Sequence, residues 1–310
     1  MPLDDPAVLI QHLHKSYGAK VAVDDVSLTV APGEIFGVLG PNGSGKTTTV
    51  ECLQGLRRPD AGQLAVFGRD PHSERRAVQR LVGSQLQDSA LPDRLKVWEA
   101  LRLFSVIGSG RRPWQELLEE WRLEGCRDQA FADLSGGQRQ RLFVALALVA
   151  EPRLVVLDEM TTGLDPEARR QAWELVAEIR DRGATVLLVT HFMEEAEQLC
   201  DRVAVLVGGR VARTGTVRDL MDGMDPWHSV RFTTAAGTDL GFLRRVEGFR
   251  ELDVGRDGRV RVRGVGALAV RVGHALVEHG LVPEDLTTEQ ANLEDAYLAL
   301  VRAADGRAER

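Results

Sequence analysis

The sequence has 310 residues, of which 44% are hydrophobic and 27% are charged, and its net charge is −7. This length accommodates one large domain and a smaller one, and the composition is ordinary for a globular protein. The negative balance excludes a broad basic surface, so we expect no nucleic-acid partner.

Neither the start of the sequence nor its apolar runs predict a membrane segment. The first ten residues, "MPLDDPAVLI", lack the basic and then apolar stretches of a signal peptide. The apolar run "LFVALALVA" has nine residues, whereas a membrane span needs about 20, so we expect a chain that does not cross a bilayer. Cys52, Cys126 and Cys200 form no CxxC pair, which predicts free thiols in a reducing cytosol rather than a zinc site or disulfides.

Residues 8–54 are predicted to form strands followed by a helix. The run "VLIQHLH" partly alternates between apolar and polar residues, and "VAVDDVSLTV" is rich in strand-forming residues. "EIFGVLG" is short and nearly all apolar, which is typical of a strand buried on both faces. The pattern is helical from Lys46 to about Gln54, and a further strand is expected within "GLRRPDAGQLAVFG".

Residues 88–134 predict a small helical insertion. The segments "RLKVWEALRLFSVIG" and "PWQELLEEWRLEG" have apolar residues at helical spacing and few β-branched runs. The stretch "GSGRRP" at 108–113 separates them.

The next segment returns to an alternation of helices and strands. Helices are predicted in "QRLFVALALVA", "EARRQAWELVAEIRDRG" and "EEAEQLC", with strands in "RLVVLD" and "TVLLVTH" between them. This alternation indicates a mainly parallel sheet with helices on both faces. "RVAVLVGGRVART" predicts a hairpin that turns at Gly208 and Gly209.

The pattern changes again near Gly223, and we interpret "MDGMDP" at 221–226 as a linker. Beyond it, "WHSVRFTT" and "GRVRVRGV" alternate as strands do, whereas "ALAVRVGHALVEHGL" and "NLEDAYLAL" have helical spacing. The sequence therefore predicts a first domain over 1–222 and a small α+β domain over 223–310, whose last residues should fray.

A glycine-rich stretch, "GPNGSGKTT", lies between the buried strand and the first helix. It fits the pattern G-x-x-x-x-G-K-[ST], in which glycines let backbone amides approach phosphate oxygens and the helix adds its positive end. Lys46 would reach the outer phosphates, and the Thr47 hydroxyl would bind Mg²⁺. The alternative is a tight turn with an incidental lysine. The phosphate-binding residues predicted here are Gly40, Pro41, Asn42, Gly43, Ser44, Gly45, Lys46, Thr47 and Thr48.

Two adjacent carboxylates, Asp158 and Glu159, end the apolar run "RLVVLD". In a parallel sheet, the carboxyl ends of the strands line the ligand crevice. Asp158 would face the Mg²⁺ through a water molecule, and Glu159 would polarise the attacking water. Without the phosphate loop, a surface acidic pair would be the favoured interpretation.

The segment "LSGGQ" at 134–138 predicts a second helix start. Ser135 and Gln138 fit a capping box, S-x-x-Q. Gly136 and Gly137 remain unexplained by the box, because glycine in a first turn costs up to about 1 kcal/mol relative to alanine. Close approach of a large anion would justify that cost.

Together, "GPNGSGKTT", "VVLDEM" and "LSGGQ" resemble the ATP-binding subunits of ABC transporters, over residues 8 to about 220. The resemblance implies an α/β fold of the P-loop NTPase class, namely an ABC ATPase. Such a fold has a mainly parallel core sheet, an N-terminal antiparallel β subdomain and a helical insertion, here followed by the small C-terminal domain. It also implies ATP and Mg²⁺ as cofactors and ATP hydrolysis as the activity.

The same resemblance assigns further site residues. Tyr17 would stack on adenine, although it could be an ordinary turn aromatic. Gln87 would lie where the helical insertion begins and bind the metal, with Gln85 as a nearby competitor. Asp165, in "TTGLDP", would belong to the ATP site, and His191 would contact the γ-phosphate, although it could be a neutral histidine at a strand end. The implied catalytic residues are Glu159, His191 and Gln87, the metal ligands are Thr47, Gln87 and Asp158, and the second part of the ATP site is Ser135, Gly136, Gly137, Gln138 and Asp165.

One residue departs from the family pattern, and one segment indicates a subgroup of the family. Met160 follows the acidic pair where the family often has a proline or a small residue, and nothing in the sequence accounts for it. "NLEDAYLAL" resembles the L-E-D-x-[FY]-L segment near the end of bacterial exporter ATPases of the daunorubicin-resistance type. An ordinary amphipathic C-terminal helix is the alternative.

The resemblance also implies partners. Two subunits would stack head to tail, with each ATP between the phosphate loop of one and Ser135–Gly137 of the other. This homodimer would drive a separate membrane permease from the cytoplasmic face of the membrane and export drugs, antibiotics or other amphiphilic compounds. The main alternative is a soluble regulatory ATPase that uses 225–310 to bind another partner.

Overall fold

The computed structural model describes residues 5–85, 90–108, 112–221, 227–235, 237–255, 257–290 and 292–308. The chain forms two compact units, one comprising Met1–Val217 with Leu300–Arg310 and the other Arg218–Ala299. Most of the predicted linker at 221–226 lies outside the described residues. That the two units are separate domains stays a prediction.

The first unit contains the predicted strands and helices in the expected order. Its strands are β1 (Val8–Tyr17), β2 (Lys20–Val30), β3 (Ile35–Leu39), β4 (Ala61–Val66), β5 (Val82–Gln85), β6 (Leu154–Asp158), β7 (Thr185–Thr190), β8 (Arg202–Val207) and β9 (Arg210–Gly215). Its helices are α1 (Lys46–Leu53), α2 (Arg75–Gln79), α3 (Val97–Ile107), α4 (Trp114–Glu120), α5 (Gly136–Leu148), α6 (Pro166–Asp181) and α7 (Met193–Leu199), with 3₁₀ turns at Glu124–Cys126 and Phe131–Asp133.

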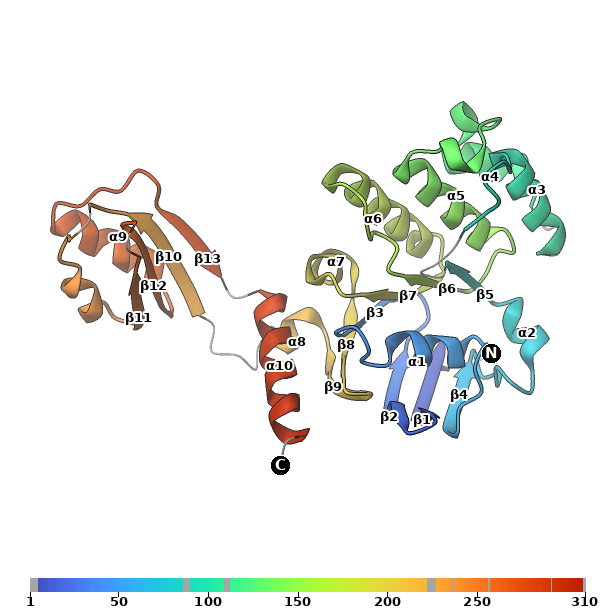
Figure 1. Ribbon diagram of the computed structural model, residues 1–310, viewed down its shortest axis with the longest axis horizontal. Coiled ribbons are helices and arrows are strands. Elements are labelled where there is room, and N and C mark those ends of the chain that lie inside the picture. The colour runs from blue at the N-terminus through green and yellow to red at the C-terminus, as the bar shows by residue number, and fades with distance from the viewer. Residues whose placement is uncertain are drawn as a thin grey trace. The chain divides into compact units, whose positions relative to one another are not determined.

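The core sheet has the order β5-β6-β7-β3-β8-β9 and is parallel except for β9. Its strands β3, β6 and β7 are buried on both faces, whereas the edge strand β9 has no fully buried residue. In the buried strands successive side chains enter different cores, as the two-residue period requires. In β6, Val155 and Leu157 pack with α3, α5 and α6, whereas Leu154 and Val156 pack with α1 and β1. Figure 1 shows α1 on one side of this sheet and α5, α6 and α7 on the other.

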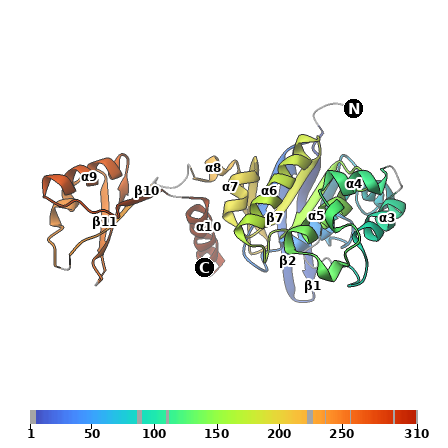
Figure 2. The ribbon, with the colours of Figure 1, turned by 90° about the horizontal axis from the view of Figure 1, so that it is seen from above.

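The N-terminal strands form a second, antiparallel sheet of order β2-β1-β4, which packs with α1 on the side of the core sheet away from α5 and α6. In the view of Figure 2, α5 and α6 cover the near face and β1 and β2 lie behind them. The predicted fold class is therefore confirmed: a P-loop NTPase core with an antiparallel β layer.

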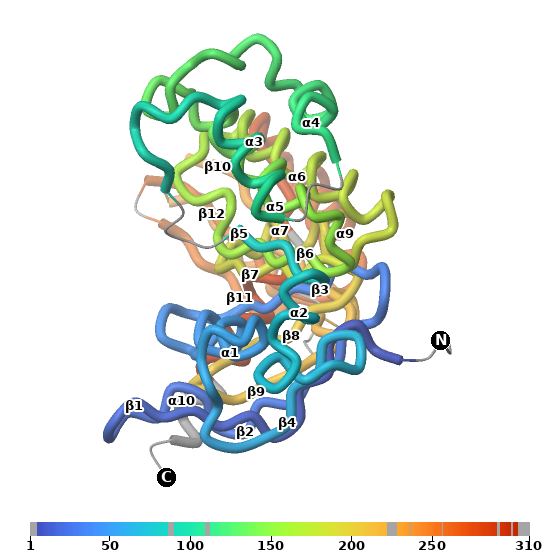
Figure 3. Tube along the Cα trace, turned by 90° about the vertical axis from the view of Figure 1, so that its right-hand side faces the viewer, coloured from blue at the N-terminus to red at the C-terminus, as the bar shows by residue number. Residues whose placement is uncertain are grey.

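In the predicted insertion, 88–134, the structure describes the helices α3 and α4 and the two 3₁₀ turns. Helix α3 ends at Ile107 and α4 begins at Trp114, so the predicted break lies between them. Trp98 and Trp114 pack at 6.0 Å between ring centroids and join the two helices. Figure 3 shows α3 and α4 at one end of the unit, with β1, β2 and β4 at the other.

The predicted hairpin is present, and it supports the phosphate loop. Strands β8 and β9 pair antiparallel, and Gly208 and Gly209 turn with φ of 57° and 78°. Positive φ at both central residues is the geometry for which glycine is preferred in two-residue hairpins. The Gly209 carbonyl accepts from Asp24 N (2.7 Å), and its N–H donates to Ser44 O (3.1 Å).

The second unit is a four-stranded antiparallel sheet with the order β11-β12-β10-β13. Its elements are β10 (Trp227–Thr233), a 3₁₀ turn at Gly241–Arg245, β11 (Phe249–Val254), β12 (Arg259–Val265), α9 (Leu268–Glu278) and β13 (Thr287–Gln290), with α8 (Val217–Met221) before them and α10 (Leu293–Ala308) after them. This order and connectivity match the ferredoxin-like β-α-β-β-α-β arrangement.

The C-terminal segment differs from the expectation in two respects. Strands β11 and β13 were not predicted, because their charged and threonine-rich sequences lack a clear apolar alternation. Helix α10 continues to Ala308, although the last residues were expected to fray. Within the described residues, no helix has both the length and the apolar character needed to cross a bilayer.

Candidate active site

The stretch Gly40–Thr48, the phosphate loop, connects β3 to α1 at the carboxyl end of the core strand. Lys46 is 5% exposed, and its Nζ donates to Gly40 O (2.8 Å) and Pro41 O (3.1 Å). The loop therefore closes around its own lysine. Thr47 is exposed, which leaves its hydroxyl accessible at the start of α1.

The glycines of the phosphate loop are required by the protein's own packing as well as by any ligand. A Cβ on Gly40 would lie 2.4 Å from Leu206 O, and one on Gly45 would lie 2.4 Å from Ala22 O. Gly45 also has φ of 99°, a conformation that side chains disfavour. Gly43 has φ of 82° but open space around it.

The two adjacent carboxylates diverge because the backbone changes conformation between them. Asp158 is the last residue of β6 and is 3% exposed. Glu159 has φ of 51°, and its N–H donates to Val189 O (2.8 Å), so the chain turns away from the strand direction. A non-glycine residue in this left-handed region is strained, and such strain is found preferentially at functional sites.

The parallel order β6-β7-β3 brings the predicted chemical groups to one edge of the sheet. His191 follows β7, and its Nδ1 lies 3.3 Å from Glu159 Oε1. Burial lowers the pKa of Lys46, and Glu159 and Asp158 act on it in the opposite direction. These four side chains, predicted from separate motifs, are therefore neighbours.

This group of side chains fits a magnesium nucleotide. Mg²⁺ prefers oxygen ligands and is commonly held by one or two carboxylates together with phosphates. Asp158 and the Thr47 hydroxyl supply oxygen donors beside the lysine that would meet the phosphates. Among the described residues, no group of three or more His, Cys, Asp or Glu side chains could hold a metal ion.

The segment 134–138 begins α5 with the predicted capping box. Ser135 Oγ accepts from Gln138 N (3.3 Å), and Gln138 Oε1 accepts from Ser135 N (2.9 Å). Gly136 has a packing role as well, since a Cβ there would lie 3.2 Å from Leu164 Cδ2. No hydrogen bond joins this segment to the phosphate loop within the part of the chain that the structure describes.

Comparison with known proteins agrees with this arrangement. Residues 23–162 match the family described as ABC transporter. The chain is 42% identical over 221 residues to Nod factor export ATP-binding protein I of Rhizobium etli, covering 70% of each protein. It is equally identical, over the same length and coverage, to the daunorubicin resistance ATP-binding protein DrrA3 of Streptomyces coeruleorubidus.

The chain belongs to the ABC transporter family of ATP-binding proteins. A solved ATP-binding subunit of an ABC transporter superposes with a TM-score of 0.62 at 31% identity, over 70% of this chain and 92% of that one. The cbiO1 protein of Clostridium perfringens, part of an ABC transporter complex, gives 0.64 at 26% identity, over 71% and 92%. As a family member, this chain is an ATP-binding ATPase.

In this ABC ATPase, two other predicted site residues, Asp165 and Tyr17, make local contacts of their own. The carboxylate of Asp165 caps α6, accepting from Glu167 N (3.0 Å) and Ala168 N (2.9 Å). Tyr17 ends β1 and is 42% exposed, and Lys15 and Arg57 lie 5.6 and 5.9 Å from its ring centroid. The exposed ring leaves a face available for stacking, and its role toward adenine stays a prediction.

Of the two glutamines considered as metal ligands, the structure describes only Gln85. Gln87 lies outside the described residues, so its assignment stays a prediction. Gln85, the competitor, is 7% exposed at the end of β5 and exchanges two hydrogen bonds with Gln140 of α5 (3.1 and 2.9 Å). These bonds give Gln85 a structural role between sheet and helix.

Met160, which the sequence left unexplained, is a core residue of this ABC ATPase. It is 3% exposed and packs in the cluster that includes Leu157 and Leu188. A flexible apolar side chain suits this irregular space next to the strained Glu159.

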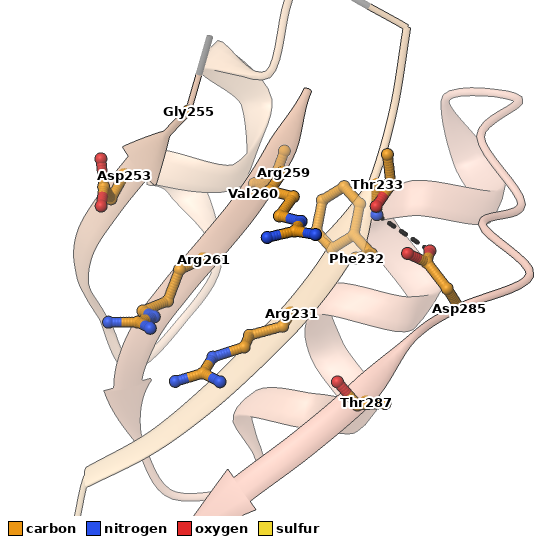
Figure 4. Close-up of a pocket in the computed structure, with 10 residues that line it drawn as sticks. All are labelled: Arg231, Phe232, Thr233, Asp253, Gly255, Arg259, Val260, Arg261, Asp285 and Thr287. Carbon is orange, nitrogen blue, oxygen red and sulfur yellow. Dashed lines mark hydrogen bonds between the residues drawn. The ribbon is translucent and has the colours of Figure 1, made fainter. Parts of the chain in front are cut away.

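A hollow of about 430 Å³ in the second unit was not anticipated from the sequence. Arg231, Arg259 and Arg261 line it together with Asp253 and Asp285 (Figure 4). Other carboxylates balance these cations, because Arg231 pairs with Glu289 (2.6 Å) and Arg259 with Asp257 (3.4 Å). This balance does not favour a triphosphate there.

Proposed function

We propose that this chain is the ATPase of a bacterial exporter and drives a separate membrane permease. The observation that carries the proposal is the convergence of Lys46, Asp158, Glu159 and His191 at the carboxyl edge of one parallel sheet. The relatives supply the direction of transport, since one is named for Nod factor export and another for daunorubicin resistance. We infer that the cargo is a drug, an antibiotic or another amphiphilic compound.

The proposed chemistry follows from the position of each group. The phosphate-loop amides and Lys46 bind the β- and γ-phosphates, and Asp158, Thr47 and Gln87 hold Mg²⁺. The metal, when bound, neutralises charge that develops on the phosphates. Glu159 takes a proton from the attacking water. His191 is hydrogen-bonded to Glu159, orients the Glu159 carboxylate and contacts the γ-phosphate.

The proposed functional form is a head-to-tail homodimer. The capped start of α5 presents Ser135, Gly136 and Gly137, and no hydrogen bond within the described chain connects them to the phosphate loop. A second copy would place them, with Gln138 and the Asp165 segment, against ATP held by the first copy. Loss of the γ-phosphate would then open the dimer, a switch of the order–disorder or rigid-body type.

The proposed location is the cytoplasmic face of the membrane, where the permease would hold the dimer. Contact is expected around Gln87 and the helices of 91–120, including α3. Leu103, Val106 and Ile107 on α3 are 49%, 74% and 71% exposed, which provides an apolar surface for such a partner.

The test is to express the chain together with a candidate membrane permease from the same organism and to measure ATP-driven uptake of a fluorescent amphiphile into inverted vesicles. We expect uptake with the native chain and none with Glu159→Gln, because that variant keeps ATP but cannot activate water. ATPase activity that persists in Glu159→Gln would contradict the assignment of the base. Normal hydrolysis without membrane association would favour the soluble regulatory ATPase instead.

A further inference from the structure

A buried carboxylate that the mechanism above does not use is hydrogen-bonded to the turn that follows Glu159. Glu195, on α7, is 1% exposed. Its Oε1 accepts a hydrogen bond from Thr161 Oγ1, whose side chain is also 1% exposed, and lies 3.5 Å from Trp173 Nε1 on α6. Its other oxygen, Oε2, has no hydrogen-bond partner among the described residues.

Such a residue is costly for folding. A buried carboxylate loses hydration, and two neutral donors on one oxygen only partly replace the water. An apolar side chain at this position would bury more favourably. The cost indicates that the hydrogen bonds of Glu195 achieve something that packing alone does not.

These hydrogen bonds join the segment that follows Glu159 to the segment that follows His191. Thr161 is two residues after Glu159, and Glu195 is four residues after His191. The two segments are thus linked three times: by Glu159 N to Val189 O (2.8 Å), by His191 to Glu159 (3.3 Å) and by Thr161 to Glu195. Of the two links made by side chains, the one between Thr161 and Glu195 is buried.

The strained backbone of Glu159 gives this link its importance. A residue with φ of 51° keeps that conformation only when the surrounding structure holds it there. Thr161 lies within the turn that follows, in which Thr162 N donates to Glu159 O (3.2 Å) and Leu164 N donates to Thr161 O (3.1 Å). Anchoring Thr161 to α7 and α6 therefore restrains the turn that aims Glu159.

We propose that Glu195 is a positioning residue for ATP hydrolysis, holding the turn after Glu159 against the helix after His191 through its hydrogen bonds to Thr161 and Trp173. This inference rests on the proposed function, in which Glu159 and His191 act on the attacking water. Glu195 itself touches neither water nor nucleotide.

The test compares Glu195→Gln and Thr161→Val with a neighbour control in the full chain. Glu194→Gln is the matched control, because Glu194 is the adjacent residue on α7, is 65% exposed and pairs with Arg169 at 3.7 Å. We expect Glu195→Gln and Thr161→Val to lower kcat by about 10- to 100-fold, as misplacement of a catalytic group does. KM for ATP should stay within about twofold, because only the transition state loses an interaction. Glu194→Gln should change neither constant by more than about twofold.

The double variant Thr161→Val with Glu195→Gln distinguishes positioning from general loosening. If the two side chains act as a pair, the double variant should have a kcat close to that of the slower single variant. An unchanged kcat in Glu195→Gln, or losses that multiply in the double variant, would overturn the proposal. Should Glu195→Gln fail to fold, Thr161→Val and Trp173→Phe carry the same kcat and KM test.

A failure of the positioning role can be told apart from a failure of the proposed function. Glu159→Gln tests the base directly, so a dead Glu159→Gln beside a fully active Glu195→Gln would reject only the positioning role. An active Glu159→Gln would reject the base assignment, whatever Glu195→Gln does.

Discussion

At the residue scale, the site depends on backbone conformations that few side chains tolerate. Glu159 adopts φ of 51°, so it diverges from Asp158 although the two are neighbours in sequence. Gly45 adopts φ of 99° with the Ala22 carbonyl 2.4 Å from the position of a Cβ. A hydrogen bond from Glu159 N to Val189 O of β7 holds the first conformation, and the close passage of β2 leaves no room for a side chain at Gly45.

Replacement of the loop glycines should separate packing from backbone strain. Gly45→Ala should lower the free energy of unfolding by about 2–3 kcal/mol, because it adds a clash to an unfavourable φ. Gly43→Ala should lower it by only about 1 kcal/mol, since its surroundings are open. Urea unfolding without nucleotide measures both. Equal losses would mean that the approach of Ala22 is unimportant.

At the element scale, the active site arises from where strands end and helices begin. Strands β3, β6 and β7 deliver the phosphate loop, the two carboxylates and His191 to one edge, because parallel neighbours end side by side. Helix α5 begins elsewhere in the unit, with Ser135 as its cap. The same serine is predicted from family resemblance to bind ATP, so its observed role as a cap and its proposed role as a ligand fall on one residue.

Two substitutions at Ser135 should separate these roles. Ser135→Ala should lower the free energy of unfolding by about 1 kcal/mol, because the cap is lost, and should also slow hydrolysis. Ser135→Asn keeps a capping side chain, so we expect stability within about 0.5 kcal/mol of the native value but still slower hydrolysis. Thermal unfolding and steady-state ATPase assays give the two quantities. Full activity in Ser135→Asn would leave Ser135 as a cap alone.

At the scale of the whole molecule, the proposed function requires two copies of the chain to complete the ATP site. The Lys46 group and the start of α5 are not joined by a hydrogen bond within the described residues, and Asp165 is occupied in capping α6. An ATP molecule bound to the phosphate loop would therefore present an open side to a second copy.

Dimerisation on ATP should be visible in solution. In Glu159→Gln with Mg²⁺ and ATP, small-angle scattering should give about twice the mass found with ADP, because the γ-phosphate is retained. Lys46→Ala with ATP is the control and should stay monomeric, since it loses the phosphate contact. A monomeric Glu159→Gln at saturating ATP would refute the shared-site arrangement.

Local patterns were sufficient for most of the first unit. The buried strands, the capping box at Ser135 and the Gly208-Gly209 hairpin follow from spacing over a few residues, and each is confirmed. Strands β11 and β13 could not be predicted, because their pairing with β12 and β10 comes from distant parts of the chain and their own sequences carry little apolar signal. For the same reason, the core position of Met160 and the Glu195–Thr161 hydrogen bond were not foreseen.

The amino-acid sequence by itself determined which groups could bind phosphate and activate water, because glycine spacing, a lysine and adjacent carboxylates are chemical requirements that short motifs record. Only the tertiary structure decided the positions and orientations of these groups. The strain at Glu159, the approach of Ala22 and Leu206 to the loop glycines, and the buried carboxylate of Glu195 depend on contacts between segments far apart in the chain. Such contacts set direction and distance, which residue identity does not encode locally.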